Sequence, residues 1–156
     1  MSESAIRAQI LVILNAVTNI GKVYDYERWA ADWTTFINLF KATIGAVDQI
    51  RGWEIVRKNA PQIDHAYGVV YVPHQFVIRG FMSVNDASAT EKTFNALIEA
   101  IQTAFRTKDT LNGTCETTRY DGRASIQVDI IEMRSFGSIL CHYAELSLFA
   151  KERISY

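Results

Sequence analysis

The side chains of this sequence that could bind a transition metal are two cysteines and three histidines. They are Cys115, Cys141, His65, His74 and His142. A zinc site needs thiolates and imidazoles that converge, and its ligands usually follow short, recognisable spacings. No such spacing occurs here, and the adjacent Cys141 and His142 would point to opposite faces of a strand. We therefore expect no metal site, and instead small buried thiols with polar or partly buried histidines.

Thiol chemistry at Cys141 would require a base on the same side of the chain and a carboxylate that orients this base. Glu145 lies on the same face of an extended strand, but no histidine accompanies the two. The phosphate-loop, dinucleotide, zinc-protease and nucleophile-elbow motifs are also absent. We expect no catalytic residue, no cofactor-binding residue and no enzyme activity. A small ligand-binding or thiol-dependent enzyme domain that uses a pocket near Cys141 and Glu145 remains as an alternative.

Basic side chains are interleaved with aromatic ones in two short segments, a pattern found in nucleic-acid-binding proteins. The segments contain Arg51, Arg57 and Lys58 beside Trp53, and Arg119 and Arg123 beside Tyr120. Both also contain acidic residues, and the whole chain has sixteen basic against seventeen acidic residues, with a net charge of −1. Because binding to the phosphate backbone depends on an excess of positive charge, we expect solvated strand faces instead.

Six aromatic residues fall within seventeen positions, which is a large number for one small core to accommodate. They are Tyr24, Tyr26, Trp29, Trp33, Phe36 and Phe40. Aromatic side chains outside a core often serve as anchors of protein interfaces. The residues are therefore candidate subunit-interface anchors, with packing beneath the first helix as the alternative.

The first half of the chain predicts helices and strands in alternation. Apolar residues at helical spacing predict a helix over residues 4–19, with Gly21 following its end. An alternating, aromatic-rich run predicts a short strand over residues 23–29. Residues 32–44 fit a short helix or a strand, and residues 50–58 fit a strand.

The second half predicts most of a sheet and the longest helix. Residues 68–84 are rich in strand-forming types but contain Pro73, which indicates two strands. Ser88 and Glu91 have capping-box spacing before a helical pattern that runs to Phe105. A short strand at residues 115–119 follows, and then two alternating runs, over residues 126–131 and 140–148, form an antiparallel hairpin.

The chain of 156 residues fits one α+β domain, with an aromatic-rich elaboration at about residues 24–44. Two successive alternating strands indicate a mainly antiparallel β-sheet with two main helices packed on one face, and residues 32–44 supply a possible short extra helix. The apolar runs are too short to cross a membrane and we recognise no signal peptide. Two cysteines in a chain of this size favour reduced thiols in a cytoplasmic setting.

The order of these elements and the residue patterns within them resemble those of the tail-terminator, or tail-completion, proteins of long-tailed bacteriophages. The segments that resemble the family are AIRAQILVILNAV followed at once by VYDY, FVIRGFM, TEKTFNALIEAIQTAFR, and the closing pair SIQVDIIEM and LCHYAELSLFAKERI. The resemblance covers nearly the whole chain. It concerns fold and element order, so no functional residue is transferred from the family.

The resemblance implies a structural protein that assembles in the host cytoplasm and belongs to the virion, at the junction of tail and neck. Such a protein forms a homo-oligomeric ring, expected to contain six subunits, that caps the tail tube and ends its polymerisation. Its expected partners are the tail tube protein and a head-neck or connector protein, and DNA passes through the lumen without specific binding. The near-neutral charge is compatible with such a lumen. A neck or head-completion protein that binds the portal is the closest alternative.

Overall fold

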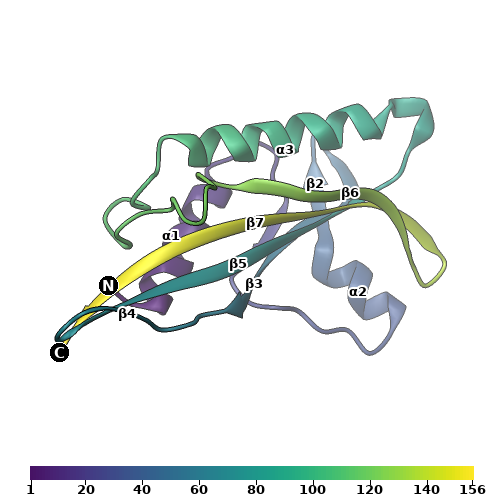
Figure 1. Ribbon diagram of the computed structural model, residues 1–156. Coiled ribbons are helices and arrows are strands. Elements are labelled where there is room, and N and C mark those ends of the chain that lie inside the picture. Colours follow the sequence, from purple (N-terminus) through teal and green to yellow (C-terminus); the bar gives the residue numbers. More distant parts are fainter.

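A mixed sheet of seven strands forms the centre of the computed structural model, which describes residues 1–156 (Figure 1). The main path of the sheet runs β1-β3-β5-β7-β6, while β2 pairs with β3 and β4 pairs with β5. Only β1 and β3 run parallel. The strands are β1 (Lys22–Tyr24), β2 (Lys41–Ile44), β3 (Val47–Asn59), β4 (Ile63–Ala66), β5 (Val69–Ser83), β6 (Gln127–Phe136) and β7 (Ile139–Ser155). The prediction of an α+β fold with a mainly antiparallel sheet is confirmed.

Helices α1 (Glu3–Asn15) and α3 (Thr90–Arg106) share the main core with one face of the sheet, which we call the helix face. Alternate residues of the central strands supply its centre, such as Trp53 in β3 and Ile78 in β5. The Trp53 indole Nε1 donates a hydrogen bond of 3.1 Å to the Ile20 carbonyl oxygen, so its only polar group is satisfied. The position of the two main helices was predicted correctly.

A second, smaller core lies on the opposite side of the sheet, which we call the outer face. Helix α2 (Trp33–Phe40) covers this core, and it contacts the alternate strand residues, including Phe81 and Tyr143. Residues 32–44 therefore form both of the expected structures, a short helix and then strand β2. The Asp32 carboxylate caps the helix by accepting a hydrogen bond of 2.9 Å from the Thr35 backbone amide.

The strand predicted over residues 23–29 ends at Tyr24, because side chains bind the backbone that follows it. Arg7 donates a hydrogen bond of 2.6 Å to the Asp25 carbonyl oxygen. The Arg28 amide donates a bond of 2.9 Å to the Glu54 carboxylate. These contacts satisfy the main chain without a strand partner, and an irregular loop leads to α2.

Pro73 does not divide residues 68–84 into two strands, because β5 is continuous through it. Lys151 of β7 lies opposite Pro73. Its backbone amide points away from β5 and donates a hydrogen bond of 2.9 Å to the Thr117 carbonyl oxygen. Pro73 therefore occupies a non-hydrogen-bonded pair with β7. Its nitrogen faces the other side of β5, where β3 pairing stops at Gln75 and β4 pairing starts at Tyr71. No ladder bond is lost there.

Two further predictions for the second half are wrong. The capping box is not formed, since Ser88 belongs to the short 3₁₀ helix η1 (Asp86–Ser88) and left-handed Ala89 precedes α3 without a side-chain cap. Asn85 instead accepts a hydrogen bond of 3.2 Å from the Ser88 amide. Residues 115–119 make a single bridge, between Thr117 and Lys151, and no strand. No helix of the protein is both long and apolar enough to span a membrane.

Candidate functional site

The two thiols lie in the two separate cores. Cys141 is in the outer-face core beside Phe81 and Tyr143, and Cys115 is in the main core. Burial raises the pKa of Cys141 to about 11. Burial, with a smaller effect from Glu116, raises the pKa of Cys115 to about 12. Little thiolate exists at neutral pH in either place, so this geometry does not favour thiol catalysis.

Glu145 and His142 are engaged elsewhere and do not form a catalytic set with Cys141. The Glu145 carboxylate accepts a hydrogen bond of 2.6 Å from the Tyr143 hydroxyl. His142 lies on the helix face, where its Nε2 shares a hydrogen bond of 2.9 Å with the Thr90 hydroxyl. As the alternation predicts, neighbouring positions of β7 face opposite sides of the sheet.

The other two histidines also lie apart. Buried His74 contacts the buried Glu152 carboxylate at 2.9 Å, and exposed His65 packs against the Tyr71 ring. Nowhere do three or more histidine, cysteine, aspartate or glutamate side chains come together in an arrangement that could hold a metal ion.

A partly buried ionic cluster, in which only Glu54 is fully buried, ties the loop before α2 to the outer face of the sheet. Arg79 donates hydrogen bonds of 2.6 Å to Glu27 and 3.3 Å to Glu54. Burial raises the pKa of Glu54, and the hydrogen bonds from Arg28 and Arg79 oppose this effect. Each charged group of this cluster pairs with another group of the same chain, so its geometry indicates a structural role.

The six candidate anchor residues range from fully buried to exposed. Phe40 is only 1% exposed and packs inside the subunit, where the Tyr24 ring meets it edge-on. Phe36 stacks between Trp33 and Phe136, with ring-centre distances of 5.1 and 5.3 Å. These contacts explain how α2 is fixed to the sheet, and they leave Phe40 no surface for a partner.

Tyr26 and Trp29 remain at the surface of the loop between β1 and α2. Their exposed fractions are 52% and 82%. The Arg28 guanidinium lies over the Tyr26 ring and also donates to its hydroxyl group. Trp29 has no aromatic or cationic partner within the chain. These two residues are therefore the part of the aromatic segment that is free to meet another protein.

The basic side chains of the two interleaved segments do not form one surface. Arg51 is buried, and its guanidinium donates to the Asn19 carbonyl oxygen at 3.1 Å and to Gln49 at 3.0 Å. Arg119 pairs with Asp109 at 2.9 Å. Arg57 is exposed on β3. Arg51 and Arg119 are thus engaged within the chain and do not combine with Arg57 into a basic surface.

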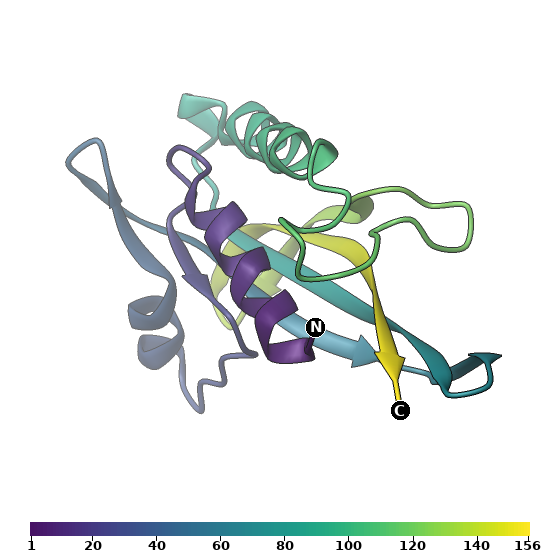
Figure 2. The ribbon, with the colours of Figure 1, turned by 90° about the vertical axis from the view of Figure 1, so that its left-hand side faces the viewer.

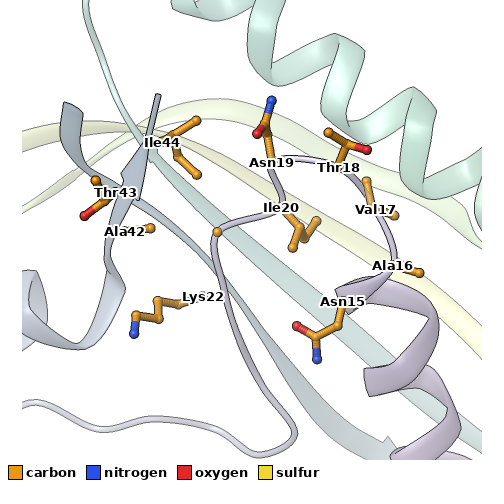
Figure 3. Close-up of a pocket in the computed structure, with 11 residues that line it drawn as sticks. Asn15, Ala16, Val17, Thr18, Asn19, Ile20, Lys22, Ala42, Thr43 and Ile44 are labelled. Atoms are coloured by element: carbon orange, nitrogen blue, oxygen red, sulfur yellow. The ribbon is translucent and has the colours of Figure 1, made fainter. Parts of the chain in front are cut away.

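A shallow cleft of about 530 Å³ lies between the loop that follows α1 and strand β2 (Figure 3). Its labelled side chains include Asn15, Asn19 and Thr43, which are neutral, and Lys22 is its only charged residue. Because it contains no carboxylate, histidine or cysteine, the cleft offers no acid–base pair for catalysis.

One group of exposed apolar side chains lies where β4, the start of β5 and the end of β7 extend past the helices. We call residues 57–71 and 153–156 the arm, which lies beside the C-terminus in both ribbon views (Figures 1 and 2). All four residues of β4 are exposed, and the large exposed apolar side chains of the arm are Ile63, Tyr67 and Tyr156. A hydrogen bond of 2.9 Å from the Tyr156 amide to the Gly68 carbonyl oxygen closes its tip.

A second group of exposed apolar side chains lies along β6 and the hairpin that joins it to β7. Its members are Ile131, Met133 and Leu140. Ile131 and Met133 lie opposite Ala144 and His142, so they project from the helix face but are not covered by a helix. The sequence contained a signal for this edge, the alternation of residues 126–131, but not for which strand would be outermost.

In comparisons with known proteins, no family model matches the chain and no curated protein sequence matches it significantly.

Proposed function

We propose that this protein is a tail-terminator subunit of a long-tailed bacteriophage. It forms a closed ring, expected to contain six copies, which caps the tail tube, ends tube polymerisation and joins the tail to the head-neck. The proposal rests on the element order that resembles this family and on the distribution of exposed apolar side chains.

The observation that carries the proposal is the presence of two unlike apolar surfaces at opposite ends of the long strands. The arm and the β6 edge have different residues and different shapes. A two-fold dimer would bury one surface against its own copy, whereas a ring joins two different surfaces of each subunit, head to tail. Exposed apolar groups at two such places suit an assembly of this second kind.

A third surface is available for the tube or the neck. Tyr26 and Trp29 are exposed on the loop before α2, a segment that belongs neither to the arm nor to the β6 edge. Exposed aromatic side chains of this type are common anchors of protein interfaces. The net charge of −1 is compatible with DNA that passes through the ring without being held.

The first test is the mass and shape of the purified protein, measured by native mass spectrometry and negative-stain microscopy. Six chains of 17.7 kDa give a species of about 106 kDa, seen as a closed ring. The same preparation should bind isolated tail tubes and stop their growth. A protein that stays monomeric and binds no tail tube would overturn the proposal. A ring that binds only the portal would identify a neck protein instead.

A further inference from the structure

We propose that the arm of one subunit docks on the β6 edge of the next copy and so forms the contact that closes the ring. This inference rests on the proposed function, because it identifies which surfaces of the terminator subunit meet. Its partner is a second copy of this chain, and the contact is heterologous.

The β6 edge presents unpaired backbone groups. β6 is last in the strand order and pairs only with β7, so one side of its ten residues has no strand partner. Natural proteins usually protect such edges with charged side chains, above all lysine, with proline or with β-bulges. β6 contains neither proline nor lysine, its one bulge lies near its start, between Val128 and Ile130, and past this bulge its two charged side chains, Glu132 and Arg134, pair with each other. The remaining edge is open to another chain.

The side chains beside this edge are apolar and exposed, as is typical of a protein contact surface. Ile131 and Met133 are 51% and 59% exposed on the helix face, beyond the cover of α3. The arm offers the matching apolar groups, Ile63, Tyr67 and Tyr156. Burying such side chains in one contact removes apolar area from water at about 25 cal/mol per Å².

The charges of the two surfaces have opposite signs. The side chains of the arm include three basic residues, Arg57, Lys58 and Arg153, against one acidic residue, Asp64. β6 has two acidic residues, Asp129 and Glu132, and one basic residue, Arg134, which is paired with Glu132. Complementary charge favours the docking of arm on edge, whereas two copies of the arm would repel each other.

The separation of the two surfaces sets the size of the ring. Val69 of β5 pairs with Ser155 at the arm. Near the other end of β5, Met82 pairs with His142, which in turn pairs with Met133 of β6, so that these residues form two rows across the sheet. Thirteen strand steps of about 3.3 Å separate these rows by about 43 Å. Successive contacts in a six-membered ring are one ring radius apart, so the contacts would lie on a circle about 85 Å across.

Engineered cysteines can test this contact because Cys115 and Cys141 are both buried and leave little background reaction. We would place Tyr67→Cys on the arm and Met133→Cys on β6, and treat the assembled protein, alone and on tail tubes, with a short bis-maleimide. The double variant should give a ladder of covalent oligomers up to the full ring. A mixture of the two single variants should give covalent dimers, while each single variant alone should give none.

The matched control pairs Met133→Cys with Thr103→Cys, which lies on the exposed side of α3 and should not react across subunits. Charge reversal supplies a second readout. Arg153→Glu and Asp129→Lys should each lower the cross-linking yield severalfold, and their combination should restore it.

Covalent dimers of Met133→Cys alone would overturn the proposal in favour of a two-fold contact between β6 edges. A ring that forms without the Tyr67 to Met133 cross-link would also overturn it, while the terminator function would stand. Conversely, a covalent ring that neither binds tail tubes nor stops their growth would support the contact and contradict the function.

Discussion

At position 80 the lack of a side chain allows the largest core residue to lie flat on the sheet. A Cβ atom at Gly80 would lie 2.3 Å from the Trp53 ring carbon Cζ3. Trp53 is fully buried and stacks on Phe94 of α3 at a ring-centre distance of 5.9 Å. Gly80 therefore sets how closely β5, β3 and α3 can pack.

Replacing Gly80 by alanine should destabilise the protein by about 1–3 kcal/mol, because the added methyl group overpacks the core. Urea unfolding, followed by tryptophan fluorescence, measures this free energy. The companion change Trp53→Phe removes the ring atoms that would clash, so Gly80→Ala should be less damaging in that background. Strictly additive effects of the two substitutions would show that the contact is not the cause.

His142 makes folding sensitive to acid. Burial lowers its pKa, and nearby Glu91 opposes the shift in part. A histidine whose folded pKa lies below the unfolded value stabilises the fold above about pH 6.5, and this stability is lost as the pH falls through the folded pKa. The fold thus holds the imidazole neutral beside the Thr90 hydroxyl.

A His142→Gln variant should lose less stability on acidification than the unsubstituted protein, because glutamine can bond to Thr90 and does not titrate. The measurement is the urea midpoint of both proteins above and below the ordinary histidine pKa of about 6.5. The difference between the two removes the effects of other groups, including the buried carboxyl of Glu54, whose raised pKa has the opposite dependence on pH. Parallel losses of stability would contradict the assignment.

Among the elements, α2 depends on few contacts. It has eight residues, too few to be stable alone, and only Phe40 is fully buried. Phe36 links Trp33, Phe81 and Phe136 into one aromatic group. This packing, and not helix propensity, holds α2 on the outer face.

Truncating Phe36 to alanine should cost about 2 kcal/mol, less than for a fully buried phenylalanine because part of the ring reaches the surface. Protease cleavage within residues 25–40 should also become faster. Trp29→Ala is the matched control, since Trp29 is 82% exposed and its loss should change stability by less than about 0.5 kcal/mol. Equal destabilisation by the two variants would rule out this account of how α2 is anchored.

The sequence predicted the elements wherever a long periodic pattern dominated. Helices α1 and α3 and the β6–β7 hairpin follow directly from their apolar spacing. Pro73 was misleading because its effect depends on a gap between β3 and β4 on the neighbouring edge, which only the assembled sheet defines. The capping box failed for a similar reason, since Asn85 caps the 3₁₀ helix by accepting from the Ser88 amide, which places Ser88 inside that helix and not at the start of α3.

The candidate site was less predictable than the fold. Six aromatic residues identified the right segment, but their separation into core and surface depends on α2 crossing the outer face. Phe40 points into the sheet and Trp29 points to solvent although both belong to the same cluster of aromatic residues. No local pattern encodes that difference.

For the whole molecule, the exposed apolar groups become meaningful only in three dimensions. Tyr67 and Tyr156 are far apart in the sequence, yet the hydrogen bond between residues 68 and 156 brings their segments together in the arm. Met133 is exposed because β6 lies outermost in the sheet. The two surfaces that we assign to subunit contacts are therefore products of topology, which the sequence predicted only in outline.

The position of β7 has a consequence for how the protein is made. This strand, formed by residues 139–155, lies between β5 and β6 and pairs with fifteen successive residues of β5. The ribosome synthesises β7 after every other strand of this sheet, so β5 and β6 must wait for the strand that joins them. During synthesis the sheet is divided and apolar strand faces are exposed. The seven-stranded sheet can therefore be completed only after β7 has been translated, although β3 and β5 can pair before then.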